Sequence, residues 1–350
     1  QIGGRRNIII NGAMNVAQRG TSSTVAEDYV ADRFRSNNAN NDENPTQSQV
    51  DVASGTTPYT LGFRKALKMT NGNQTGGAGT TDRVAIIYNI EAQDIANSGW
   101  NYTSATSYIT IQFWVKASVS QNYYVQLRSR DGTEQAFAFE TGSLTADTWT
   151  KVTKTVPGAS NIQFDNNNGI GLALEWNIFR GTAKTGSMTL DQWAAFDGSV
   201  RVPDMTTTWY TTNDATFEIT GVQLEVGSQA TPFEHRSFHE ERELCRRYYH
   251  AIVGTMGSWG SAVAYSTQNA QGWYSIHPEM RAAPTFTWTG TLKLEDGASG
   301  KTTTNTTAST TMGTHGFSWW CGGFTGLTDN YVYYVYESGQ TGYFQLDAEL

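Results

Sequence analysis

The sequence predicts an all-β protein built from two β-sandwich domains that are joined by one short α-helix. Glycine supplies 35 of the 350 residues, aromatic residues 12%, and charged residues only 16%, against about 25% charged in an ordinary soluble domain. Runs of alternating apolar and polar residues recur about every 8–15 residues between Gly- and Asn-rich turns, a spacing that favours sandwiches. Because one core seldom serves more than about 250–300 residues, the length predicts two domains.

The first domain is expected over residues 1–235. It opens with the apolar run Ile8–Ile10, which is closed by the turn dipeptide Asn11-Gly12 and therefore predicts a strand followed by a turn. The stretch from Ser36 to Pro45 is polar and contains no aromatic residue, so it predicts a solvated loop.

Strands follow through the rest of this domain. In the strand predicted from Tyr108 to Ala117, four apolar residues alternate with polar ones and share one face, so the strand is expected to be half buried. These four residues are Ile109, Ile111, Phe113 and Val115. The other strands are predicted at 83–90, 123–130, 136–139, 148–156, 171–178 and 216–226.

A helix is expected from Ser237 to His250, inside a linker of residues 236–252. The segment is rich in charge, lacks Gly and Pro, and starts with Ser237 and Glu240 at the spacing of a capping box. Leu244, Tyr248 and Ile252 form its apolar stripe. Arg242, Arg246 and Arg247 alternate with glutamates, which indicates a solvated or subunit-contacting face.

The second domain is expected over residues 253–350. Strands are predicted at 261–266, 272–276, 285–294, 316–321 and 331–337, and a closing strand at 342–350 places Phe344, Leu346 and Ala348 on one face. The threonine-rich stretch from Lys301 to Thr311 predicts a low-complexity polar loop.

Charge and hydropathy exclude several classes of partner. Lys and Arg number 24 against 32 Asp and Glu, a net charge of −8, and such a body repels nucleic acid. No run approaches the roughly 18–20 apolar residues that span a bilayer, and the first residues do not form a signal peptide. We therefore expect neither nucleic-acid binding nor membrane insertion.

No pattern of residues indicates catalysis, a cofactor or a metal site. Cys245 and Cys321 are too few for a structural zinc site and are expected to be free thiols, although a disulfide between them is left open. Nucleophile-elbow, zinc-protease, calcium-loop and phosphate-loop motifs are absent. A glycoside hydrolase would need a pair of carboxylates, for which Glu175, Asp191 and Glu218 are the candidates; we expect no enzyme activity.

Aromatic residues are the more useful signal. A sugar ring stacks its C–H face on Trp or Tyr while Asn, Gln and Asp bind its hydroxyls. Any single one of these aromatic residues is expected to fill a sandwich core, but at least one of the set is expected to contact a ligand at the surface. We expect ligand contact from aromatic residues on loops of the second domain, namely Trp259, Trp273, Trp319 and Trp320.

Three stretches resemble phage virion proteins, often tail fibres, that carry a domain similar to carbohydrate-binding-module jelly rolls. They are Asn7 to Gly20 with Ala31 to Phe34, then Gly221 to Arg236 running into Glu241 to Tyr249, and Pro278 to Pro284. The middle stretch, with its Pro-Phe-Glu corner and Cys-x-Arg-Tyr-Tyr helix, is the most specific. The matches bracket residues 7–284.

The resemblance implies a non-enzymatic virion protein on the particle surface, a short tail fibre or tip that contacts a host surface glycan or protein. It also implies a homotrimer, in which Leu244, Tyr248 and Ile252 could line the axis. The alternatives are a capsid or tail decoration protein that binds other virion proteins and, more remotely, a polysaccharide depolymerase. The family's calcium ligands are replaced by Asn11 and Asn15 at the first strand, which lowers affinity for a hard cation and leaves calcium open.

Overall fold

The computed structural model describes residues 6–253, 260–289, 292–297, 300–303, 306–337 and 343–350. The chain divides into a larger unit, Gln1–Arg242 with Leu350, and a smaller unit, Glu243–Glu349. Both are built from antiparallel strands with few short helices, so the predicted all-β class is confirmed.

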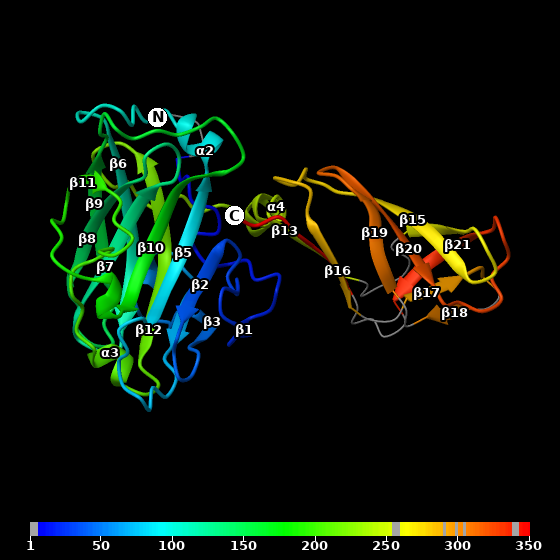
Figure 1. Cartoon of the computed structure of the whole chain (residues 1–350), viewed down its shortest axis with the longest axis horizontal. Coiled ribbons are helices and arrows are strands. Elements are labelled where there is room, and N and C mark those ends of the chain that lie inside the picture. The colour runs from blue at the N-terminus through cyan, green and yellow to red at the C-terminus, as the bar shows by residue number, and fades with distance from the viewer. Residues whose placement is uncertain (1–5, 254–259, 290–291, 298–299, 304–305, 338–342) are drawn as a thin grey trace. The chain divides into compact units, whose positions relative to one another are not determined.

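The larger unit is a sandwich of two six-stranded sheets, whose antiparallel strands lie along roughly the same axis (Figure 1). Along the first sheet the order is β1 (Ser22–Ser23), β3 (Thr46–Asp51), β4 (Lys65–Thr70), β12 (Thr216–Val226), β6 (Tyr108–Ala117) and β9 (Thr150–Pro157). Along the second it is β11 (Trp193–Ala195), β8 (Gln135–Ser143), β7 (Asn122–Ser129), β10 (Ile170–Arg180), β5 (Arg83–Glu91) and β2 (Phe34–Ala39). The short helices of this unit are α1 (Thr57–Thr60), α2 (Ala92–Ala96), η1 (Thr182–Lys184) and α3 (Thr208–Thr211).

The core of the larger unit lies between these two sheets. Phe113 of β6 meets Trp176 of β10 edge-on, with ring centroids 5.8 Å apart, and Phe34 of β2 packs on Tyr88 of β5 at 4.8 Å. The four alternating residues predicted to be buried in β6 are all fully buried. The strand is not half buried as expected, because Thr110 and Gln112 on its other face are also buried and donate to carbonyls of the segment that follows β12. The predicted bounds of β6 and β12 are confirmed.

The smaller unit contains a three-stranded and a seven-stranded sheet that share one core. The three-stranded sheet has the order β13 (Tyr249–Val253), β22 (Tyr343–Asp347) and β16 (Thr285–Thr289). The seven-stranded sheet has the order β18 (Gly300–Thr303), β17 (Leu292–Glu295), β21 (Val332–Glu337), β14 (Gly260–Ala264), β15 (Asn269–Ser275), β20 (Gly316–Gly322) and β19 (Thr306–Met312).

Helix α4 (Phe238–Arg246) is shorter than predicted. Ser237 caps it, because its hydroxyl accepts the Glu240 amide at 3.2 Å. The prediction of helix as far as His250 is wrong: the aromatic and β-branched residues from Tyr249 onward favour a strand, and they form β13 against β22.

Three predictions of local structure are also wrong. Ser36–Ala39 belongs to β2 rather than to a loop, because these residues pair with apolar β5. The threonine-rich stretch 301–311 contributes to β18 and β19, in keeping with the strand propensity of β-branched residues. Ile8–Ile10 forms no strand: the amide of Ile8 donates to the carbonyl of Leu224, but the amides of Ile9 and Ile10 donate to the side chains of Asn7 and Tyr88.

Three charged side chains hold the first described residues against the end of the larger unit, and we call Glu234, Arg236 and Glu241 the N-terminal clamp. Glu234 accepts the amides of Arg6 and Asn7 at 3.1 and 2.8 Å. Arg236 donates to the carbonyls of Asn7 and Ile9 and forms ion pairs with Glu234 at 3.0 Å and Glu241 at 3.3 Å. Glu241 accepts the amide of Asn11. Two stretches that carry the family resemblance therefore meet here.

Candidate functional site

One face of the seven-stranded sheet in the smaller unit carries exposed aromatic side chains. Because β15 and β20 pair with Gln271 opposite Trp320 and Trp273 opposite Ser318, both tryptophans lie on this face. Val263 of β14 pairs with Gln271 on one side and Val332 on the other, which adds β21 to the same face. We call Trp273, Trp320, Val332 and Tyr334 the aromatic face.

The alternation of side chains explains this arrangement. Within β15, Gln271, Trp273 and Ser275 point outward, whereas Ala270 and Gly272 point into the core. A Cβ at Gly272 would lie 2.5 Å from the ring of Trp319, so glycine is what allows that ring to pack there. The outer face of β15 therefore exposes Trp273 to solvent, and its inner face packs against the buried Trp319 of β20.

The aromatic face is exposed and is bordered by polar groups. Trp273 and Tyr334 are each 59% exposed and Val332 is 57% exposed. Trp273, Ser275, Thr311 and Ser318 line a shallow groove of about 500 Å³. Beside Tyr334, Glu295 of β17 forms an ion pair with Lys293 at 3.3 Å.

The four predicted ligand tryptophans have different positions. Trp273 is exposed and Trp320 half-buried, and both lie on strands rather than on the expected loops. Trp319 is only 5% exposed and contacts Phe344 in the core, so it is not a surface contact: neighbouring residues of a strand face opposite sides. Trp259 lies outside the described residues.

The predicted apolar stripe for a trimer axis does not exist as one helix face. Leu244 is in α4, but Tyr248 lies beyond the end of that helix and Ile252 is in β13. Tyr248 and Ile252 are 1% and 7% exposed. The error follows from the helix that was predicted too long.

The three candidate carboxylates for hydrolysis are not brought together as a pair. Glu175 is in β10 and Glu218 in β12, on the outward faces of opposite sheets. The backbones of packed sheets are about 10 Å apart, and because both side chains point away from the core, the two carboxylates lie still further apart. Each is occupied by cations: Glu175 by Arg180 and Arg201, and Glu218 by Lys116 at 3.0 Å. Asp191 forms an ion pair with Lys154 at 2.6 Å.

The two cysteines are buried in the structure, and Asn11, which replaces a calcium ligand of the resembled family, has a structural role. Cys245 and Cys321 are buried and are not joined by a disulfide, and burial raises the pKa of the Cys321 thiol to about 12. Asn11 binds the backbone of Val16 and Asp32 with its side chain. Within the part of the chain that the structure describes, no three His, Cys, Asp or Glu side chains gather as metal ligands, and no helix is long and apolar enough to cross a membrane.

A second aromatic site, in the larger unit, was not expected. Phe63, Trp114, Phe233 and His235 line a pocket of about 470 Å³ on the outer face of the first sheet. Gly221 has a φ of +63° and forms part of its wall. The Pro-Phe-Glu-His stretch was the available signal, since it supplies both Phe233 and His235.

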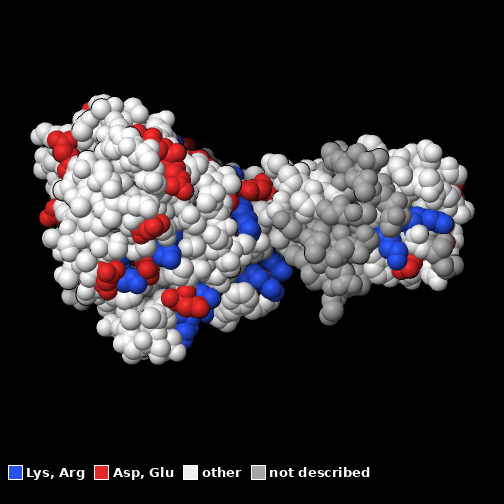
Figure 2. Space-filling view, turned by 90° about the horizontal axis from the view of Figure 1, so that it is seen from below, with Lys and Arg blue, Asp and Glu red and all other residues white. Residues whose placement is uncertain are grey.

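Charges on the visible face of the larger unit lie in small mixed groups, and most of that face carries neither sign (Figure 2). This distribution matters for ligand binding because local clusters of charged side chains, rather than the net charge of the chain, determine which ligands bind at a given place.

No family model and no curated protein matches the chain. Among solved structures it is similar to the enzymatically active domain of bacteriophage CBA120 tailspike protein 4, at 11% identity and a TM-score of 0.32, over 63% of this chain and 21% of that one. It is also similar to a putative sugar binding protein from Bacteroides thetaiotaomicron, at 11% identity and TM-score 0.33, over 63% and 100%. A family 16 carbohydrate binding module matches at 14% identity and TM-score 0.25, over 51% and 84%. Shared function does not follow at such values.

Proposed function

We propose that this chain is a non-enzymatic attachment protein of a phage virion, a short tail fibre or tip, which binds a glycan on the host surface through the aromatic face. The observation that carries the proposal is the exposure of Trp273 and Tyr334, each 59%, on one sheet. Large aromatic side chains that are solvent-exposed on one flat face are typical of a surface that binds a partner or ligand.

The chemistry of this face suits a sugar. The rings offer apolar platforms for the C–H face of a pyranose, and Gln271 and Ser275, which are exposed on the same side of β15, can hydrogen bond to hydroxyls. The three sequence stretches that resemble phage tail-fibre proteins support the virion setting.

One observation favours a second function. Val332 is 57% exposed within the same face, and an aliphatic side chain suits a protein partner better than a sugar. In this alternative the chain decorates the capsid or tail, and the aromatic face binds another virion protein or a second copy in a trimer.

The test is the binding of fluorescently labelled protein to a panel of intact bacterial cells before and after periodate oxidation of their glycans. We expect saturable binding that oxidation abolishes and that Trp273→Ala weakens about tenfold, the value of roughly one well-packed aromatic contact. Phe238→Ala is the control, because Phe238 is also exposed, at 56%, but lies outside the aromatic face. Reducing-end release from the cell polysaccharide would contradict the non-enzymatic assignment.

Absence of cell binding, together with an oligomer in light scattering that Trp273→Ala dissociates, would overturn the glycan proposal in favour of the virion partner. Equal binding by Trp273→Ala and Phe238→Ala would remove the aromatic face from either function.

A further inference from the structure

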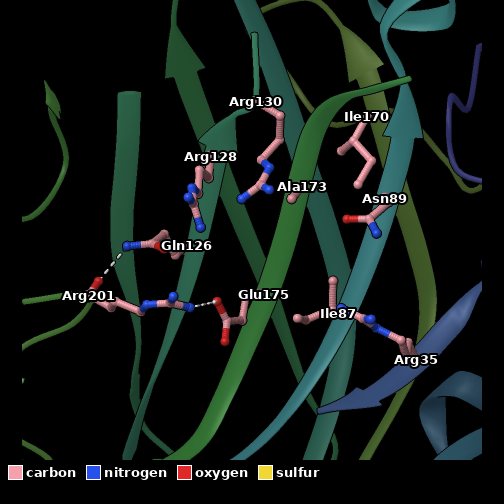
Figure 3. A pocket seen from close by; sticks show the side chains of 10 residues that line it. All are labelled: Arg35, Ile87, Asn89, Gln126, Arg128, Arg130, Ile170, Ala173, Glu175 and Arg201. Carbon is pink, nitrogen blue, oxygen red and sulfur yellow. Dashed lines mark hydrogen bonds and ion pairs between the residues drawn. The ribbon is translucent and has the colours of Figure 1, made fainter. Parts of the chain in front are cut away.

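A groove rich in arginine lies on the outer face of the second sheet of the larger unit. Its floor is made by small and apolar residues of the two central strands, Ala173 of β10 and Ile87 of β5. Four arginines surround the floor, and among the residues that the structure describes Glu175 is the one acid that lines it (Figure 3). The arginines are Arg35 from β2, Arg128 from β7, and Arg130 and Arg201 from loops.

The register of the strands builds this cluster. Glu175 pairs with Ile87 on one side and with Gln126 on the other, and Arg35 pairs with Ile87. One row across the face therefore runs from Arg35 to Gln126. In the next row Ala173 lies between Asn89 and Arg128, so a methyl group is flanked by two long polar side chains.

Positive charge is in excess around the groove because each of three glutamates is shared by two arginines. Glu27 binds Arg35 at 3.0 Å and Arg83 at 3.4 Å. Glu134 binds Arg128, and Arg130 at 3.4 Å, while Glu175 binds Arg180, and Arg201 at 3.8 Å. Six cations thus share three anions, in a chain whose net charge is −8.

The arginines also act on one another. Burial is the main cause that lowers the pKa of Arg128, and the charges of Arg130 and Arg201 lower it further, against the opposing effect of Glu134. Arg201 and Arg83 likewise add to the effect of burial on the pKa of Arg180. An added anion would relieve this repulsion.

The guanidinium groups of the groove are held in place, and some of their N–H donors have no acceptor. The ring centroid of Phe196 lies 3.3 Å from the guanidinium carbon of Arg128 and 5.3 Å from that of Arg201. The ring therefore contacts both guanidinium groups and helps to fix their positions. The Nε atoms of Arg35 and Arg201 are cut off from solvent and meet no hydrogen-bond acceptor among the residues described. A buried donor without an acceptor is unfavourable, and a shift of either guanidinium that uncovers its Nε would let a ligand oxygen satisfy it.

The size and the other polar groups indicate what the ligand is. The cavity is about 90 Å³, room for about three water molecules or one small anionic group but not for a whole ligand, since pockets for whole small molecules are about 300 Å³ or more. The amide nitrogens of Asn89 and Gln126 donate to Leu350 and Arg201. Their carbonyl oxygens can therefore accept hydroxyl groups next to the anion, and that of Asn89 points into the groove in Figure 3.

We infer that this groove binds the carboxylate of an acidic sugar, with the arginines on the carboxylate and the two amides on neighbouring hydroxyls. Planar guanidinium groups match a carboxylate with two parallel hydrogen bonds. The inference is independent of the aromatic face, which belongs to the other unit.

The test is calorimetric titration of the full chain with polygalacturonate and with its methyl ester, which has the same backbone without the charge. We expect polygalacturonate to bind at least tenfold more tightly, as a charge-assisted hydrogen bond requires. The affinity for polygalacturonate should fall about tenfold in each of three variants, Arg35→Gln, Arg130→Gln and Arg201→Gln. These variants should fold, because each partner glutamate keeps its second arginine.

Arg64→Gln is the matched control, because Arg64 is an arginine of the same unit that does not line the groove. Equal affinity for the acid and its ester, no heat with polygalacturonate, or equal affinity in all four variants would overturn the assignment. Inorganic sulfate that binds as tightly as the polymer would also overturn it, because the groove would then be a site for free anions. Trp273→Ala should leave this titration unchanged, which separates it from the proposed function.

Discussion

Replacement of Arg236 by methionine tests whether the N-terminal clamp stabilises the larger unit. The side chain of Arg236 is only 4% exposed, and methionine keeps much of its apolar stem while removing the charge. The variant leaves the carboxylates of Glu234 and Glu241 without their cation and the carbonyls of Asn7 and Ile9 without their donor.

Removal of one member of a buried ion pair costs about 3–5 kcal/mol, because the partner charge remains buried. Glu241 is only 5% exposed and keeps one backbone amide, that of Asn11, so it fits this case more closely. Glu234 keeps two backbone amides. We expect a loss of about 3–5 kcal/mol in the free energy of unfolding, which lowers the melting temperature of a unit of this size by about 6–20 °C.

Scanning calorimetry of the full chain measures this loss. Arg64→Met is the control, because Arg64 lies at the surface over Tyr59 and should cost less than about 1 kcal/mol. Combination of Arg236→Met with Glu234→Gln and Glu241→Gln should restore part of the stability, because no charge is then left unpaired. A melting temperature for Arg236→Met equal to that of the control would refute the role of the clamp.

Two further predictions concern titratable groups. Burial raises the pKa of Glu234, but hydrogen bonds from Asn7 and Arg6 and the charge of Arg236 outweigh burial and hold the folded pKa below the ordinary 4.5. The contribution of Glu234 to stability is therefore present above pH 4.5 and is lost as pH falls through the folded pKa. In urea unfolding at about pH 6 and about pH 3.5, wild type should lose more stability on acidification than Glu234→Gln, and equal losses would contradict this. Because Cys245 and Cys321 are buried thiols outside any disulfide, a thiol reagent at about pH 8 should label neither in the native chain and both after unfolding. Rapid labelling of native protein would contradict their burial.

The sequence was sufficient for strands whose own alternation reports their burial. The bounds of β6 followed from apolar residues at every second position, but the expectation that this strand is half buried was wrong, because its polar face is also covered. Polar strands were missed because pairing, not composition, makes them strands: Ser36–Ala39 is held by its ladder to β5. The helix was extended too far because Leu244, Tyr248 and Ile252 fit helical spacing, although the residues from Tyr249 onward prefer a strand.

The candidate sites were less predictable. Alternation alone implies that Trp319 and Trp320 face opposite sides, but which of them is buried depends on the core that the fold builds. The arginine groove could not be foreseen, since Arg35, Arg128 and Arg201 come from distant segments and meet only through the register of β2, β5, β10 and β7. Pairwise register of that kind leaves no pattern within any one strand.

The central position of β12 in the first sheet has a consequence for synthesis of the chain. Because β12 lies between β4 and β6, a growing chain that has reached about residue 215 contains both neighbours but not the strand that joins them. Two half-sheets then offer unpaired edges to other chains, and contacts this distant in sequence form slowly. The interval before Thr216–Val226 leaves the ribosome is therefore when this protein is most exposed to aggregation, and when a chaperone would assist it most.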